Sequence, residues 1–193
     1  MGTLDYYNKN ASLYASDTLN ADMSAMYSVF EKYVPQGRIL DLGCGAGRDT
    51  KYFLGEGYKV TAVDGSEELC SYASAYTGIY VQCMLFGDME FNGEFEGVWA
   101  CSSLLHVPKG ELNDIFDKVA KALKPGGIFY VSFKYGDFSG ERNGRYFTDL
   151  NEDGLKEVLG EEPKFDILET LITTDVRPGR ENEKWLNALL RKQ

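Results

Sequence analysis

The sequence of 193 residues lacks the features of several protein classes. Its four cysteines are Cys44, Cys70, Cys83 and Cys101; none are spaced as C-x-x-C, and the single histidine, His106, has no cysteine at zinc-ligand spacing. We therefore expect no metal site, and we expect reduced thiols in a cytoplasmic protein. No apolar run is long enough to span a bilayer, and the N-terminal stretch has no signal-peptide pattern, so we expect no membrane partner.

An excess of basic residues is also lacking. The chain has 20 Lys and Arg against 30 Asp and Glu, which gives a net charge of −10 at pH 7. Binding to nucleic acid depends on a basic surface that releases counterions, so DNA is not expected as a partner. The content of 44% hydrophobic and 26% charged residues is ordinary for a soluble globular protein. The length favours a single domain over residues 1–193.

A strand, a glycine-rich turn and a helix are predicted in succession near residue 40. The apolar run Ile39–Leu42 is typical of a strand buried on both faces. Gly43, Gly45 and Gly47 follow, and glycine lets the chain turn tightly and lets a ligand approach the backbone. This order places a ligand at the carboxyl end of a parallel strand. The dinucleotide fingerprint G-x-G-x-x-G would need glycine where Arg48 stands, which disfavours a nicotinamide-dependent reductase.

With Asp41 before the glycines, this stretch resembles motif I, E/D-x-G-x-G-x-G, of the class I S-adenosylmethionine (SAM)-dependent methyltransferases. The L-K-P-G-G stretch at 123–127, followed by an expected strand at 128–133, resembles a second family-typical segment. The resemblance covers nearly the whole chain, which looks like the small soluble enzymes of the UbiE and TehB kind. It implies an α/β, Rossmann-like three-layer sandwich with a mostly parallel seven-stranded sheet, an antiparallel last strand and an N-terminal helical flap.

Two downstream acidic residues fit the same family. Asp64 ends the predicted strand 58–64, roughly twenty residues past the glycine loop, where nucleotide-binding folds place a carboxylate on the ribose hydroxyls. Asp88 and Met89 follow a predicted third strand, 79–83, and the resemblance implies that they contact adenine. The expected cofactor-binding residues are Asp41, Gly43, Cys44, Gly45, Gly47, Arg48, Asp64, Gly65, Ser66, Asp88, Met89, Cys101 and Ser102.

Two further segments are expected to meet the acceptor. Residues 134–147 form the longest predicted irregular segment and mix aromatic with basic residues, so we expect an acceptor wall whose arginines hold an anionic group. The alternative is a solvated loop with surface ion pairs. For the polar stretch 5–18, the resemblance implies a flap that folds over bound SAM. The expected substrate-contacting residues are Tyr7, Tyr14, Lys134, Arg142, Arg145 and Tyr146.

His106 is the candidate catalytic residue. It follows the predicted fourth strand, 95–101, at the edge where ligands bind in such sheets. An ordinary pKa of about 6.5 suits a general base near neutral pH. A structural histidine bonded to a backbone carbonyl is the alternative, and a thiol or soft oxyanion acceptor would need no base.

The remaining segments complete the predicted fold. Apolar residues at helical spacing predict a helix over 23–33 that ends at 34–37, so residues 1–37 are expected to form a helical lid on a core of residues 38–193. Helices are predicted at 111–123 and 151–159, and a strand at 165–174. The segment 185–190 has helical propensity, but the resemblance implies the antiparallel last strand, and we predict a strand there.

The predicted function is methyl transfer from SAM to a small molecule, with S-adenosylhomocysteine as product. The sequence contains neither the Pro-Pro-aromatic motif nor the Pro-Cys pair that DNA base methyltransferases of this family use. The acceptor atom stays open among O, N, S and an oxyanion. A protein or RNA acceptor and a SAM-binding protein without catalysis are the alternatives. We expect a monomer or a homodimer.

Overall fold

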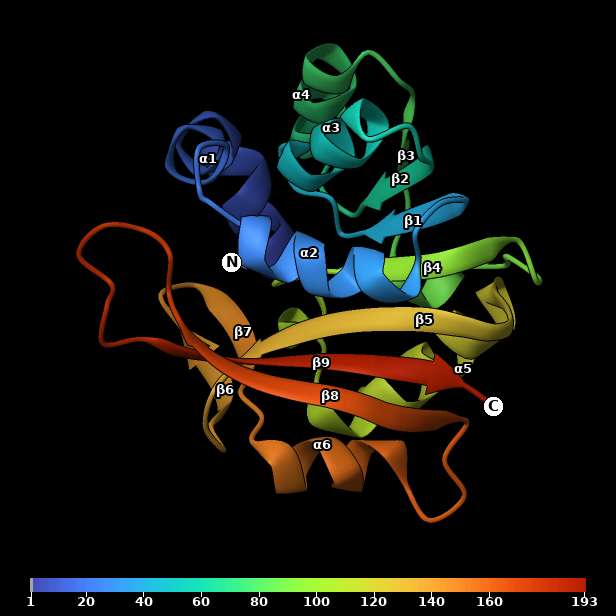
Figure 1. The fold of residues 1–193 in the computed structure, drawn as a ribbon. Coiled ribbons are helices and arrows are strands. Elements are labelled where there is room, and N and C mark those ends of the chain that lie inside the picture. Colours follow the sequence, from blue (N-terminus) through green and yellow to red (C-terminus); the bar gives the residue numbers. More distant parts are fainter. Residues whose placement is uncertain (1) are drawn as a thin grey trace.

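A seven-stranded sheet organises the chain, as a computed structural model that describes residues 2–193 shows (Figure 1). In spatial order its strands are β3 (Val81–Cys83), β2 (Lys59–Asp64), β1 (Arg38–Leu42), β4 (Phe95–Ala100), β5 (Leu123–Lys134), β9 (Lys184–Lys192) and β8 (Phe165–Thr174). The other six strands run parallel to one another, and β9 runs antiparallel to both of its neighbours, β5 and β8. The predicted sheet, with its antiparallel last strand, is confirmed.

Strand β9 forms against its helical propensity because it lies between two other strands. It pairs with β5 on one side and with β8 on the other, so its backbone hydrogen bonds are made within the sheet. Leu186, Leu189 and Leu190 are fully buried, which is the burial expected of a strand covered on both faces. Tertiary pairing therefore overrides local propensity here.

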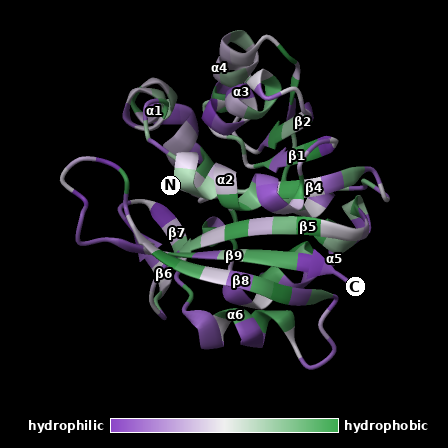
Figure 2. Cartoon of the chain, in the orientation of Figure 1, coloured by the Kyte–Doolittle hydropathy of each residue, from purple (hydrophilic) through white to green (hydrophobic). Residues whose placement is uncertain are grey.

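Helices cover both faces of the sheet and make a three-layer sandwich (Figure 1). One face is covered by α2 (Ser24–Tyr33), α3 (Arg48–Gly55) and α4 (Glu67–Thr77), and the other by α5 (Leu112–Ala122) and α6 (Glu152–Leu159). Phe30 of α2 and Trp99 of β4 belong to one apolar cluster, whereas Phe116 of α5 and Phe129 of β5 belong to the other. Figure 2 shows hydrophobic residues along β5 and β9 and hydrophilic ones on α6.

The first helix, α1 (Thr3–Thr18), lies over the carboxyl ends of the strands and packs against α4. Its only buried residues are Ala11 and Ala15, whose small side chains allow α1 to lie close to the rest of the protein without a large apolar interface. Asn8 Oδ1 accepts a hydrogen bond from the Ser66 hydroxyl at 2.6 Å, and Thr3 Oγ1 accepts one from the Tyr146 amide at 3.0 Å. The division into a lid, 1–37, and a core, 38–193, stays a prediction.

The prediction of an irregular segment over 134–147 is wrong. Strand β5 continues to Lys134, and a hairpin of β6 (Ser139–Arg142) and β7 (Arg145–Thr148) follows. Asn143 and Gly144 make its two-residue turn with φ of 51° and 75°. Asn-Gly is the preferred pair for this turn because both positions need positive φ, so the dipeptide was an unused signal in the sequence.

Candidate functional site

The glycine loop after β1 is held against β2 and β4. The amides of Gly43 and Cys44 both donate to the Val63 carbonyl, at 2.9 and 3.0 Å. Gly43 and Gly47 have φ of 78° and 91°, and a Cβ on Gly43 would lie 2.4 Å from the Cβ of Ser103. Only glycine fits such a conformation and approach, so the loop's backbone forms the surface itself.

Asp64, at the end of β2, is fixed beside this loop. Its Oδ2 accepts the Gly45 amide and its Oδ1 accepts the Ser66 amide, both at 2.9 Å. Burial raises the pKa of the Asp64 carboxyl above its ordinary value, while these backbone donors act in the opposite direction. Each carboxylate oxygen keeps acceptor capacity for a ligand hydroxyl.

A cavity of about 390 Å³, here named the glycine-loop cavity, opens at this point. Its size lies within the roughly 300–1,000 Å³ of small-molecule sites. Gly43, Gly45 and Gly65 line it together with Asp64 and Asp88. Leu4, Leu69, Leu85, Phe86 and Ile115 add apolar wall. The lining therefore combines acceptors for hydroxyl and amino groups with apolar surface for a flat ring.

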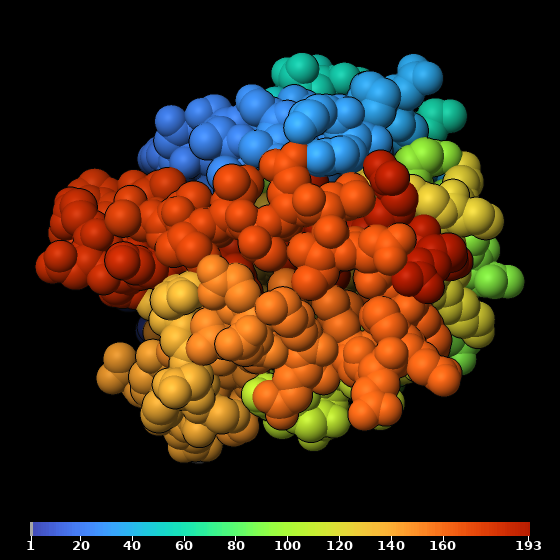
Figure 3. All heavy atoms as spheres, turned by 60° about the horizontal axis from the view of Figure 1, so that its bottom comes forward, coloured from blue at the N-terminus to red at the C-terminus, as the bar shows by residue number. Residues whose placement is uncertain are grey.

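A second cavity of about 210 Å³, the hairpin cavity, lies between α1, the hairpin and the β8–β9 connection. Its lining includes Tyr6, Asn10, Arg48, Cys101, Ser132, Lys134, Arg145, Phe147, Asp175, Arg177, Trp185 and Asn187. Figure 3 shows the connection, in red, standing out from the body of the molecule beside the blue N-terminal helices. Tyr7, Tyr14, Ser102 and His106 line both cavities, so these four residues form their common wall.

His106 occupies this wall as a neutral imidazole. Its Nδ1 lies 2.6 Å from the Tyr146 carbonyl, which can only accept, so Nδ1 carries the proton. Its Nε2 then accepts from the Tyr7 hydroxyl at 2.7 Å. Burial, with Arg145 nearby, lowers the pKa of His106 to about 4, although the bond to Tyr146 acts upward. The unprotonated Nε2 of the imidazole is thus a hydrogen-bond acceptor for Tyr7 of α1.

Ser102 holds the other side of the wall in an unusual conformation. Its φ is 55°, in the left-handed region that costs a non-glycine residue roughly 1–2 kcal/mol. The Ser102 amide donates to Ser132 Oγ at 2.8 Å, which holds the strained turn at the end of β4. Such strain is found preferentially at functional sites.

Comparisons with known proteins agree with this geometry. A methyltransferase-domain family matches residues 39–127. YqeM of Bacillus subtilis (strain 168), named as a methyltransferase, is 30% identical over 159 residues, which cover 76% of this chain and 63% of YqeM. The ubiquinone biosynthesis O-methyltransferase of Xanthomonas campestris pv. campestris (strain B100) is 33% identical over 106 residues, or 51% of this chain and 44% of that enzyme. The chain is similar to the class I SAM-dependent methyltransferases. The chain spans less than two thirds of the length of either relative.

A solved structure shows the same fold. It is the 1,6-didemethyltoxoflavin-N1-methyltransferase of Burkholderia thailandensis with bound 1,6-didemethyltoxoflavin and S-adenosylhomocysteine. The TM-score is 0.77 at 21% identity, and the match covers 98% of this chain and 85% of that one. The fold predicted from the sequence is confirmed, and the sequence matches support the predicted family.

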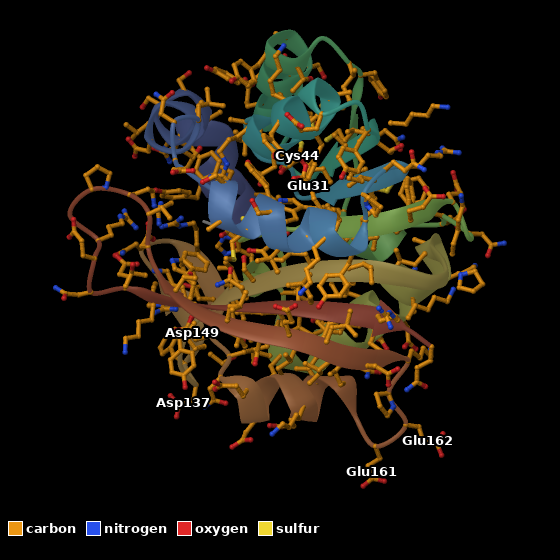
Figure 4. The ribbon with its side chains drawn as sticks, in the orientation of Figure 1. Glu31, Cys44, Asp137, Asp149, Glu161 and Glu162 are labelled. Atoms are coloured by element: carbon orange, nitrogen blue, oxygen red, sulfur yellow. The ribbon has the colours of Figure 1, made fainter. Side chains whose placement is uncertain are left out.

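Not every residue expected from the family resemblance reaches a cavity. The glycine-loop cavity is lined by Gly43, Gly45, Asp64, Gly65, Asp88 and Ser102, and the hairpin cavity by Arg48, Cys101 and Ser102. Cys44 instead joins a small apolar cluster with Cys70, and Figure 4 marks its place near the end of β1. Met89 is buried in the main core. Gly47 and Ser66 line neither cavity: they mark the N-terminal ends of α3 and α4.

Asp41 of motif I also lies behind the loop rather than at its surface. It is 1% exposed, and its Oδ2 accepts a hydrogen bond from the Thr50 hydroxyl at 2.5 Å. Burial, with nearby Asp49, raises the pKa of Asp41 to about 8. The side chain thus connects β1 to α3, and it acts on the site through the loop's position.

The predicted acceptor residues divide in the same way. Tyr7, Tyr14, Lys134 and Arg145 line the hairpin cavity. Arg142 does not: its guanidinium pairs with Asp149, labelled in Figure 4, and lies over the rings of Phe138 and Phe147. Tyr146 also lines neither cavity and contributes its backbone carbonyl to His106.

Sequence reasoning missed the group that anchors Arg48. Asp49 accepts from Arg48 Nε at 2.6 Å and Nη2 at 2.9 Å, from the Tyr27 hydroxyl at 2.5 Å and from Trp99 Nε1 at 2.8 Å. Arg48 beside it lowers the pKa of Asp49 despite the opposing effect of burial. Arg48 and Asp49 are adjacent in the sequence, but the other two partners of Asp49, Tyr27 and Trp99, come from α2 and β4 and could not be inferred from local sequence.

Proposed function

We propose that the chain transfers a methyl group from SAM to a small-molecule acceptor. The observation that carries this proposal is the pair of cavities that meet at one wall of Tyr7, Tyr14, Ser102 and His106. Methyl transfer needs donor and acceptor aligned across a short gap, and such positioning can supply roughly 7–11 kcal/mol of the barrier. Two adjoining cavities with a shared wall provide that alignment.

The glycine-loop cavity fits SAM. When bound, SAM supplies the methyl group from its sulfonium, and S-adenosylhomocysteine is the leaving group. Asp64 would accept from the ribose hydroxyls, since its carboxylate is held in place by two amides. Asp88 would accept from the adenine amino group, between apolar walls that include Leu85 and Phe86. Gly43 and Gly45, which line the same cavity, would lie beside the amino-acid portion.

The hairpin cavity suits a small acceptor. Its volume of about 210 Å³ and its cover by α1 favour a compact molecule over a polypeptide or RNA. The names of similar proteins point the same way, since one is a ubiquinone biosynthesis O-methyltransferase and another holds bound 1,6-didemethyltoxoflavin. The free cysteines favour a cytoplasmic location for the enzyme.

His106 would act as the base through Tyr7. Its Nε2 already accepts from the Tyr7 hydroxyl, so an acceptor proton passes to the Tyr7 oxygen as the Tyr7 proton moves to Nε2. Tyr146 keeps the proton on Nδ1 and orients the ring. A positioned base whose pKa lies near the operating pH contributes roughly 10²–10⁴-fold. Because burial lowers the pKa of His106 to about 4, and not the ordinary value expected from the sequence, its contribution falls below that range and well below what alignment supplies.

The test is calorimetric titration of the cofactor-free protein with SAM, S-adenosylhomocysteine and NADH. We expect binding of the first two only, weakened in Asp64→Ala by about 1.5–3 kcal/mol for the lost charged hydrogen bonds. Asp166→Ala, on exposed β8, is the matched control and should bind as wild type. Absence of SAM binding would remove the basis of the proposal, and binding without any S-adenosylhomocysteine formation across small acceptors would favour a non-catalytic SAM-binding protein.

A further inference from the structure

Arg145 of β7 differs from the other basic residues of the hairpin cavity. Arg48 pairs with Asp49, Lys134 with Glu183, Arg177 with Asp175 and Arg180 with Glu183. Arg145 has no carboxylate partner within residues 2–193. In a chain with ten more acidic than basic residues, carboxylates are abundant, so the unpaired cation at a cavity wall stands out.

Aromatic rings and one hydroxyl are the neighbours of Arg145. The centre of its guanidinium lies 4.4 Å from the Tyr6 ring centroid and 5.1 Å from that of Phe147. Nη1 donates to the Tyr7 hydroxyl at 3.3 Å, and the buried Nε has no hydrogen-bond partner. Aromatic faces attract the cation but satisfy none of its N–H donors. The terminal Nη1 and Nη2 groups therefore keep N–H donors for a ligand, because within residues 2–193 they make a single hydrogen bond, to Tyr7.

We propose that the acceptor is a planar molecule with an anionic group, and that Arg145 binds that group. The inference rests on the proposed methyl transfer and names its substrate class. A guanidinium pairs with planar oxyanions through two parallel hydrogen bonds. Tyr6, Phe147 and Trp185 supply flat apolar walls, and about 210 Å³ limits the ligand to about one or two rings. The anion then neutralises a cation that the protein leaves unpaired.

Two other roles for Arg145 are separable by experiment. Arg145 could bind the carboxylate of SAM, in which case its loss would weaken binding of S-adenosylhomocysteine. It could also only hold α1 closed through Tyr7, in which case its loss would weaken charged and neutral acceptors alike. Only an acceptor anion site predicts a loss confined to the charged ligand.

The experiment compares 3,4-dihydroxybenzoate with 3,4-dihydroxybenzamide, which share the ring and differ in charge. Each is titrated calorimetrically into protein saturated with S-adenosylhomocysteine. We expect at least tenfold tighter binding of the carboxylate to wild type, and equal binding of both to Arg145→Met. Arg142→Met is the matched control, because Arg142 lies in the same hairpin, pairs with Asp149 and lines neither cavity. It should keep the tenfold preference.

Arg145→Lys guards against a folding defect, since it retains the cation and should retain a preference for the carboxylate. Equal binding of both probes to wild type, or no binding of either, overturns the proposal. So does an unchanged preference in Arg145→Met, or a loss of S-adenosylhomocysteine affinity in that variant alone. If wild type binds no S-adenosylhomocysteine, the proposed methyl transfer fails, and the same pair of probes still tests Arg145 in its absence.

Discussion

His106 and its partners link three parts of the molecule through single side chains. The imidazole stands after β4, Tyr7 comes from α1, and the Tyr146 carbonyl comes from the hairpin. The ring also packs edge-on against Phe147, with centroids 4.8 Å apart. These contacts fix the tautomer of the imidazole and leave Nε2 as its only acceptor atom.

We expect NMR to find this histidine neutral far below its ordinary titration range. It is the only histidine, so one imidazole signal reports it. The pKa should be about 4, with the proton on Nδ1 in the neutral form. Arg145→Met should raise the pKa because a nearby cation is removed, and Tyr7→Phe should raise it because the neutral form loses a donor. A pKa near 6.5 in the wild type would contradict the arrangement.

Asp41 gives a second prediction for a single residue. Its pKa is raised from 3.8 to about 8 in the folded state, so the unfolded chain ionises first. The contribution of Asp41 to stability is present below pH 3.8 and is lost progressively as pH rises to about 8. We therefore expect Asp41→Asn to become increasingly stable relative to wild type over that range, measured by denaturant unfolding. A constant difference between pH 5 and 8 would count against the prediction.

At the scale of elements, the Asp49 carboxylate ties α2, α3 and β4 together. Asp49→Asn would leave the guanidinium of Arg48, whose side chain is 21% exposed, without its ion pair. Breaking a buried pair in this way costs about 3–5 kcal/mol. We expect that loss in denaturant unfolding, with no measurable change in Asp153→Asn, whose side chain is 92% exposed in a surface pair with Lys156. Equal effects of the two substitutions would show that the Asp49 cluster does not stabilise the fold.

Helices with a regular spacing of apolar residues could be predicted from the sequence. Strands whose limits depend on the strand they pair with were harder to predict. The apolar face that includes Leu112, Phe116 and Val119 predicted α5 to within a residue or so. The helix ends at Ala122, and the strand expected from residue 128 begins earlier, at Leu123, where a register shift against β4 accommodates the extra residues. The hairpin was missed because its strands are short and carry charges, although Asn143-Gly144 marked its turn.

At the scale of the whole molecule, the net charge of −10 predicts a response to salt. Like charges repel in the compact state, and ions screen this repulsion over about 10 Å at 0.1 M. We expect the melting temperature to rise as NaCl increases from low to physiological concentration. No helix within residues 2–193 is long and apolar enough to cross a membrane.

A variant with a smaller net charge tests whether charge repulsion causes the salt dependence of the melting temperature. Glu161 and Glu162 project from the loop between α6 and β8 and are exposed (Figure 4). Replacing both with lysine changes the charge by two each, from −10 to −6. The salt-dependent rise should shrink in this variant. A melting temperature that falls with salt in the wild type would contradict the screening argument.

The sequence by itself determined the fold class, the family and the loop beside which the cofactor is proposed to bind. These follow from local patterns: an apolar strand, glycines that need positive φ, and acidic residues at strand ends. Only the tertiary structure decided which residues share a cavity. Asp41, Met89 and Arg142 carry the expected chemistry but face other partners, whereas Arg145 and Tyr7, 138 positions apart, meet at one wall. The physical reason is that a side chain's neighbours across the fold depend on packing between distant segments, which local patterns do not encode.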